Sequence, residues 1–171
     1  QQVTVDGKAV VKPARRLVFL LHKPRGFVSS VSDPEGRPTV IDLVRPLARR
    51  QRLFPVGRLD INTTGALLIT NDGELCYRLT HPRFQIARVY QVRVRGDVSS
   101  SQLHRLLRLA QEGVRDREQP RATRPKVEIV RQLEKEAIIQ VTLLEGRNRQ
   151  VRLMCEEVRL HVVALKRVSF G

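Results

Sequence analysis

Alternating hydrophobic and polar positions predict that this chain is built mainly of strands. Residues 88–95 alternate most regularly, with Tyr90, Val92 and Val94 on one face and Val89, Gln91, Arg93 and Arg95 on the other, which is the period of a half-buried strand. Two short strands around the Asp6-Gly7 turn are expected within residues 3–11. Apolar runs predict further strands over residues 17–21, 27–31, 53–56, 66–70, 127–130, 137–144 and 161–170.

Helical spacing predicts four helices between these strands, over residues 40–47 (one or two turns), 74–80, 103–110 and 150–158. Pro82 should stop the second helix, and Ser100 or Ser101 should cap the third. Turn-forming and charged residues predict a linker over residues 12–16 and loops over residues 32–38 and 114–125. Because strands dominate and helices are interspersed irregularly, the pattern predicts an α+β fold with a mixed, largely antiparallel central sheet and flanking helices.

Charge is the strongest signal in the composition. The 171 residues include 32 Lys and Arg against 17 Asp and Glu, a formal net charge of +15. Such a surplus favours a nucleic-acid partner, because phosphates neutralised by basic side chains release counterions. The alternative is that the arginine content only reflects genome composition and a soluble surface. With 41% hydrophobic residues, the chain has enough apolar material for a folded core.

Several common kinds of site are missing from the sequence. It has no Gly-rich phosphate loop ending in Gly-Lys-Ser/Thr, no His-Glu-x-x-His helix and no Cys-x-x-Cys pair. We therefore expect neither a metal nor a cofactor. Cys76 and Cys155 stand far apart within apolar segments, which indicates reduced core thiols and a cytoplasmic protein. No segment reaches the length of a membrane span.

Three segments are candidates for carrying chemistry. In residues 54–73, Asp60 lies between two expected strands, and the flanking glycines allow sharp turns and close approach of a ligand. In residues 145–152, three arginines and two amides lie at the expected start of a helix, a favourable place for phosphate. The third segment is Arg88-Val89-Tyr90. Taken singly, each has an ordinary explanation: a turn aspartate, a solvated basic loop and a strand tyrosine.

In combination, the three segments resemble the RsuA/RluB family of ribosomal RNA pseudouridine synthases. The resemblance covers nearly the whole chain and runs through residues 20–26, residues 32–40, Gly57-Arg58-Leu59-Asp60, residues 88–90 and residues 146–152. It implies the family's fold, with an active-site cleft across the sheet. The stretch 32–40 resembles the branch that modifies large-subunit (23S) rRNA more than the branch that modifies small-subunit (16S) rRNA.

The resemblance also implies roles for individual residues. Asp60 stands at the position of the catalytic aspartate, which acts as a nucleophile or assists glycosidic cleavage, and Tyr90 at that of the tyrosine that stacks on the target base and aids proton removal. Arg152 matches a basic residue that pairs with the aspartate, and such a guanidinium would keep the carboxylate ionised. The family needs no cofactor or metal. The implied RNA-binding residues are Arg58, Lys23, Arg25, Arg88, Arg147, Arg149 and Gln150.

Two residues depart from the family pattern. Arg88 replaces the usual lysine and keeps its charge, whereas Arg159 replaces a glycine that commonly follows the last helix, which predicts a reshaped turn. Residues 1–14 resemble the end of a small N-terminal RNA-binding domain plus a linker, and residues 15–171 the catalytic domain. Most of the small domain is absent, which suggests truncation or proteolysis. The expected partner is ribosomal RNA, in a stem-loop or a ribosomal precursor, with no membrane contact and a monomeric protein.

Two other classes of protein compete with this interpretation. A non-catalytic RNA-binding or ribosome-assembly protein of the same fold should have lost Asp60, Tyr90 or Arg152, and all three are present. A metal-dependent nuclease would need clustered carboxylates around divalent ions, yet Asp60 has no acidic neighbour before Asp72.

Overall fold

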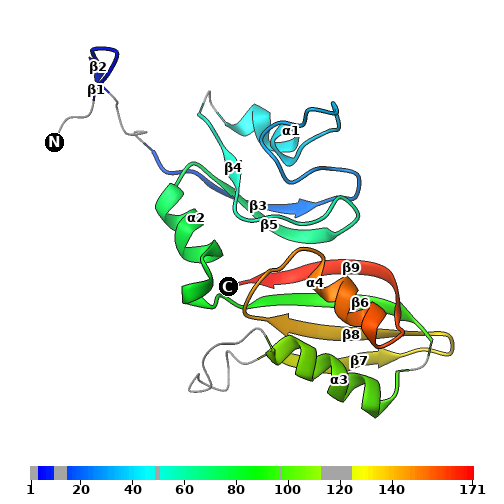
Figure 1. Cartoon of the computed structure of the whole chain (residues 1–171). Helices are drawn as coiled ribbons and strands as arrows, with labels where there is room; N and C mark the ends of the chain where they lie inside the picture. Colours follow the sequence, from blue (N-terminus) through cyan, green and yellow to red (C-terminus); the bar gives the residue numbers. More distant parts are fainter. Residues whose placement is uncertain (1–3, 10–14, 49–50, 97, 113–124) are drawn as a thin grey trace.

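The computed structural model describes residues 4–9, 15–48, 51–96, 98–112 and 125–171. A hairpin of β1 (Thr4–Val5) and β2 (Lys8–Ala9) precedes a seven-stranded sheet. The order of neighbours in that sheet is β3 (Val18–Lys23), β5 (Thr64–Thr70), β9 (His161–Phe170), β6 (Arg88–Arg95), β8 (Glu136–Leu143) and β7 (Lys126–Gln132), and β4 (Phe54–Pro55) also pairs with β5. All these pairings are antiparallel except that of β5 with β9, so the fold is α+β with a mixed, largely antiparallel sheet, as predicted (Figure 1).

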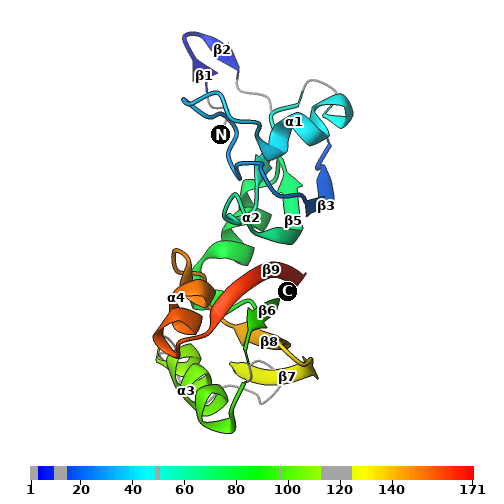
Figure 2. The same ribbon diagram turned by 90° about the vertical axis from the view of Figure 1, so that its right-hand side faces the viewer.

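The large sheet consists of two halves that meet where β5 runs beside β9 (Figure 2). This pairing covers only Thr64 with Lys166 and Gly65 with Arg167, whereas β6 pairs with β8 and β9 along its whole length. Gly65 has φ +108°, and a Cβ on it would lie 2.0 Å from the Arg167 carbonyl oxygen. The joint therefore requires glycine, because only a residue without a side chain permits this approach.

Helices cover one face of the half formed by β9, β6, β8 and β7 (Figure 2). There α3 (Ser100–Gln111) packs against β7, α4 (Gln150–Glu157) packs against β9, and the two helices contact each other. On the other half, α1 (Val40–Val44) contacts β4 and continues into the 3-10 helix η1 (Arg45–Leu47). The core takes alternate strand positions, among them Leu67, Ile69, Val92, Val94, Ile139 and Val141. No helix in the described part of the chain is long and apolar enough to cross a membrane.

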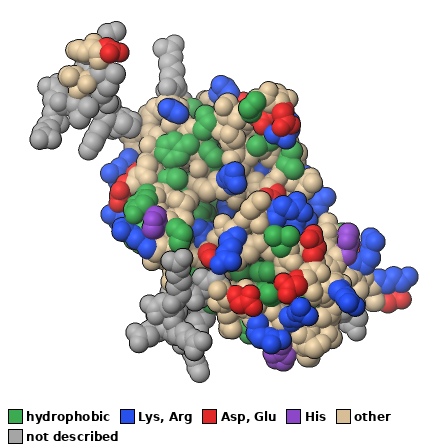
Figure 3. Space-filling view, viewed as in Figure 1, with side chains coloured by type: hydrophobic (Ala, Val, Ile, Leu, Met, Phe, Trp, Pro, Cys, Tyr) green, Lys and Arg blue, Asp and Glu red, His purple; other side chains and the backbone are tan. Residues whose placement is uncertain are grey.

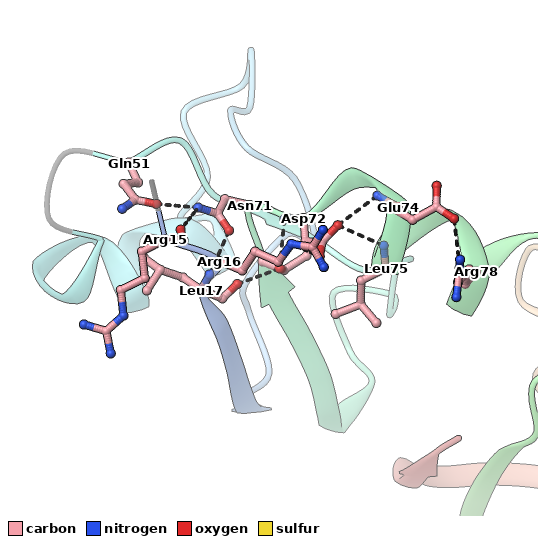
Figure 4. A network of polar contacts seen from close by, with 10 residues as sticks. Arg15, Arg16, Leu17, Gln51, Asn71, Asp72, Glu74, Leu75 and Arg78 are labelled. Carbon is pink, nitrogen blue, oxygen red and sulfur yellow. Dashed lines mark hydrogen bonds and ion pairs between the residues drawn. The ribbon is translucent and has the colours of Figure 1, made fainter. Parts of the chain in front are cut away.

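A polar network ties the segment before β3 to the corner between β5 and α2 (Gly73–Thr80) (Figure 4). The Asn71 side chain accepts from the Leu17 N–H at 2.8 Å and donates to the Arg15 carbonyl at 2.9 Å. The Asp72 carboxylate accepts from two N–H groups of the first turn of α2, at 3.0 and 3.1 Å, and pairs with Arg16 at 3.2 Å. Asp72 is thus the N-cap of the helix that leads from one half of the sheet to the other.

Most predicted elements are confirmed, and the strands over residues 88–95 and 161–170 match from end to end. The strand predicted over residues 27–31 is wrong, because Val28 makes only an isolated bridge to Thr39. The third helix is capped by Ser99, one residue before the predicted caps. Most of the predicted linker and nearly all of the loop predicted over residues 114–125 lie outside the described residues.

Two predictions about single residues are wrong in part. Arg159 itself adopts the left-handed conformation, with φ +60°, and its N–H donates to the Glu156 carbonyl at 2.9 Å. The turn that glycine would favour is therefore kept rather than reshaped. Cys155 is a buried core thiol as expected, but Cys76 on α2 is only partly buried.

Candidate active site

Asp60 lies on the loop between β4 and β5, residues 56–63, whose backbone is held from the neighbouring segment. The Ser29 hydroxyl donates to the Leu59 carbonyl at 2.8 Å and accepts from the Leu59 N–H at 3.1 Å. The Asp60 carboxylate, in contrast, is partly exposed and makes no hydrogen bond or ion pair with any residue that the structure describes. The backbone is thus fixed while the carboxylate stays free to meet a ligand.

Lys23 holds the same loop from inside the protein. Its side chain is fully buried, and its ammonium lies 3.0–3.3 Å from the backbone carbonyls of Pro24, Asp60, Ile61 and Thr63. The prediction that Lys23 contacts RNA is therefore wrong, because the surrounding backbone encloses this group and takes up its donors. Burial lowers the pKa of Lys23 to about 8, and the nearby Asp60 carboxylate partly opposes this effect.

We expect this lowered pKa to appear in the pH dependence of stability. Between about pH 8 and pH 10.5 the unfolded lysine still binds a proton that the folded one has lost, so this group makes the free energy of unfolding rise with pH. Relative to Lys23→Met, the wild type should gain about 2–3 kcal/mol over this window. Denaturant unfolding of both proteins at several pH values measures the difference, and parallel pH profiles would show that Lys23 has an ordinary pKa.

Tyr90 approaches the Asp60 loop from β6. The register of β6 against β9 shifts between Val89 and Tyr90, which brings Tyr90 opposite Arg167, and such bulges commonly redirect side chains next to active sites. Arg167 is only 2% exposed. Its Nε donates to the Ala66 carbonyl at 2.7 Å, while its Nη2 is buried without a partner. Burial lowers the pKa of Arg167, and the adjacent Tyr90 side chain partly opposes this.

Arg88 and Arg167 form a buried pair of cations. Their guanidinium carbons lie 5.4 and 4.5 Å from the centroid of the Phe170 ring, and burial lowers the pKa of both arginines. Within the described residues, no carboxylate lies within 4.0 Å of either group. A buried charge without a partner is costly, so this pair favours an anion as its ligand.

Two adjoining hollows share Asp60, Tyr90 and Arg58. The first, of about 390 Å³, extends toward Arg147, Arg149 and Gln150 at the start of α4, and the second, of about 730 Å³, toward Arg88, Arg167 and Phe170. Figure 3 shows Lys and Arg side chains over the middle of the molecule, where the two halves of the sheet meet. The hollows thus form a cationic cleft across the sheet with one free carboxylate in it.

Besides the buried Lys23, two other predicted site residues do not line these hollows. Arg25 is exposed, and Arg152 is partly buried on α4. No ion pair of 4.0 Å or less joins Arg152 to Asp60, both of which the structure describes, so their pairing stays a prediction. No group of three or more His, Cys, Asp or Glu side chains in the described ranges is placed to hold a metal ion.

Arg167 and Phe170 are the candidates that sequence reasoning missed. The alternation of β9 puts Arg167 on the same buried face as Leu165. An arginine at a core position of a strand is rare unless it is paired or functional. The place of Arg167 among the inward-facing positions of the strand was the signal in the sequence that could have identified this residue.

Comparison with known proteins identifies the family. The family model described as RNA pseudouridylate synthase matches residues 17–157. The chain belongs to this family. A crystal structure of a pseudouridylate synthase aligns with a TM-score of 0.74 and 30% identity, over 95% of this chain and 66% of that one. Human RNA pseudouridylate synthase domain containing 1 shares the fold, with a TM-score of 0.54 at 17% identity.

Curated relatives in the RNA pseudouridylate synthase family are longer than this chain. The ribosomal large subunit pseudouridine synthase B of Bacillus subtilis is 39% identical over 99% of this chain, which spans 67% of that protein. The protein of the same name from Pseudomonas aeruginosa is 42% identical over 99% of the chain, which spans 44% of it. The chain therefore covers between 44% and 67% of these two relatives.

Proposed function

We propose that this protein converts a specific uridine of large-subunit (23S) ribosomal RNA to pseudouridine. The observation that carries the proposal is the cleft in which Asp60 and Tyr90 face a common space among arginines. Family membership supplies the reaction class. The names of the relatives at 39% and 42% identity favour the large subunit over the small-subunit (16S) alternative.

The proposed reaction is an isomerisation, so no atoms are gained or lost overall. The bond from ribose C1′ to uracil N1 breaks, the uracil rotates, and a bond from C1′ to uracil C5 forms, after which C5 gives up its proton and N1 gains one. Asp60 acts in the first step, as a nucleophile or by assisting the cleavage, and both routes need a carboxylate that can reach the substrate. Tyr90 stacks on the base and aids removal of the C5 proton.

Recognition is proposed to rest on the arginines around the cleft. A uridine in folded RNA must leave its base stack to reach Asp60, which costs a few kcal/mol. Arg58, exposed beside the catalytic acid, is placed to brace the vacated space, and Arg147 and Arg149 are placed to hold the flanking phosphates. Arg88 acts from within the cleft rather than from its rim, because it is buried.

The remaining proposals concern the organisation of the protein. Residues 15–171 form the catalytic domain, and residues 1–14 are the end of a small RNA-binding domain with its linker. The protein acts as a monomer, and its ribosomal substrate places it in the cytoplasm. The mass of the protein in solution tests the oligomeric state.

Pseudouridine mapping on ribosomal RNA incubated with the protein tests the proposed function. The large- and small-subunit RNAs are supplied both free and as ribosomal precursors, with and without an excess of metal chelator. We expect pseudouridine at one uridine of the large-subunit RNA in the presence of chelator. Modification of small-subunit RNA alone would correct the target. If the protein binds RNA but modifies none, and a version extended by the upstream domain of its relatives does the same, the non-catalytic alternative is favoured. Strand cleavage that chelator abolishes would favour a nuclease.

A further inference from the structure

We propose that four side chains on α2, on the following 3-10 helix η2 (Pro82–Phe84) and at the residue between them form a stacking site for an unpaired base of the RNA substrate. These four residues, named here the α2 platform, are Tyr77, His81, Arg83 and Phe84. The inference rests on the proposed function, because it assigns a further contact to the RNA that would enter the cleft. Nothing in the proposed chemistry uses these residues.

The side chains of the α2 platform contact one another. The Tyr77 ring lies 4.9 Å from the His81 ring and 5.8 Å from the Phe84 ring, measured between centroids. The Arg83 guanidinium carbon lies 4.4 Å from the centroid of Phe84 and 5.2 Å from that of Tyr77. The Nδ1 atom of His81 accepts from the Arg83 N–H at 3.2 Å, which fixes the imidazole in place. The four groups therefore form a preorganised surface of π-faces and one cation.

This surface is open to solvent. Tyr77 is 40% and Phe84 37% exposed, whereas the other five Tyr and Phe residues of the chain are buried or partly buried. Figure 3 shows hydrophobic and basic side chains around a histidine over α2. Large aromatic side chains contribute most to stability when buried, so a cluster of them left on the surface marks a binding site.

The α2 platform adjoins the cleft. Thr80, which lies between Tyr77 and His81 in the sequence, lines the same hollow as Asp60 and Tyr90. The Arg88 guanidinium also donates to the Leu79 carbonyl of the same helix, at 3.4 Å. An RNA strand whose target uridine enters the cleft therefore passes close to α2.

The chemistry of the α2 platform favours RNA over a protein partner. Unpaired bases bind by stacking on aromatic rings and on arginine planes, and phosphates pair with guanidinium groups. The Arg83 guanidinium lies over the aromatic surface and, within the described residues, has no carboxylate partner, whereas the neighbouring Arg78 pairs with Glu74 at 2.8 Å. The chain as a whole carries a net charge of +15, which matches a polyanion.

Affinity for short RNA tests the proposal without requiring turnover. The probes are a labelled single-stranded RNA and the duplex that it forms with its complement, and the proteins are the wild type, Tyr77→Ala/Phe84→Ala, Arg83→Ala and Ile129→Ala. Ile129 on β7 is 39% exposed and serves as a matched control at the far edge of the sheet. We expect the double variant to bind the single strand about 10-fold more weakly, with the duplex unaffected and Ile129→Ala unchanged.

Salt dependence separates stacking from charge. The double variant should keep the wild-type slope of log K against log salt, whereas Arg83→Ala should reduce it by about one. If the double variant is poorly folded by thermal unfolding, Phe84→Leu, which keeps the apolar volume and loses the π-face, replaces it. Unchanged affinity for the single strand, or an equal loss of affinity for single strand and duplex, would refute the proposal that the α2 platform stacks on an unpaired base. Pseudouridine mapping run in parallel reports separately on the proposed function, because a protein that binds RNA through α2 but modifies none would refute only the enzymatic proposal.

Discussion

Replacing Asp60 with Asn is expected to lower the rate of pseudouridine formation by at least about 10³-fold. Asparagine has nearly the same shape as aspartate but carries no charge, so it can neither attack the substrate nor assist cleavage as a carboxylate does. The side chain makes no hydrogen bond or ion pair within the described residues, so the fold and the RNA affinity should be preserved. Rates under single-turnover conditions, together with thermal unfolding, measure the two effects separately.

Asp72→Asn is the matched control for this substitution. Asp72 follows β5, whereas Asp60 precedes it, and Asp72 caps α2 and does not line the cleft. Asparagine caps helices about as well as aspartate, and the ion-pair partner Arg16 has a side chain that is 80% exposed, so stability should change by less than about 1 kcal/mol. Wild-type activity in Asp60→Asn, or an equal loss of activity in both variants, would refute the proposed catalytic role of Asp60.

Gly65→Ala is expected to lower the free energy of unfolding by at least about 4 kcal/mol. The added Cβ would lie 2.0 Å from the carbonyl oxygen, 2.8 Å from the nitrogen and 2.9 Å from the carbonyl carbon of Arg167. All three are backbone atoms, so no side-chain rotation relieves the clash, and φ +108° adds strain for any residue with a side chain. Because β5 and β9 pair only here, the two halves of the sheet should separate, and activity should fall with stability.

Gly73→Ala is the control for the loss of a glycine. Its Cβ would meet no atom within 4 Å, its φ is not positive, and it occupies the first position of α2. We expect a change in stability within about 0.5 kcal/mol. Denaturant unfolding compares the two variants. Wild-type stability in Gly65→Ala would contradict the close approach of Gly65 to the Arg167 backbone.

The order of elements could be predicted well because their signals are local. The period of two in β6 and β9 and the proline that follows α2 are local features of the sequence. The strand predicted over residues 27–31 failed because an apolar run also suits a segment that packs without pairing. There Ser29 bonds to Leu59 on the Asp60 loop instead of joining the sheet.

The candidate site could be predicted only in part. The motif around Asp60, through the family resemblance, predicted Tyr90, Arg58, Arg147 and Arg149 as site residues. All four line the cleft together with Asp60. Lys23 belongs to the same motifs but proved to be internal. Whether a lysine meets phosphate or backbone carbonyls depends on what surrounds it, and a motif does not contain that information.

The sequence by itself determined the strand-rich α+β pattern, the order of the elements and the family, because these follow from residue spacing and from motifs within short segments. Only the tertiary structure decided where the halves of the sheet meet, which arginines are buried and what Lys23 bonds to. These features depend on pairs such as Arg167 and Ala66, which are 101 residues apart. The register and packing that bring such pairs together are settled by the whole core at once, so no local pattern specifies them.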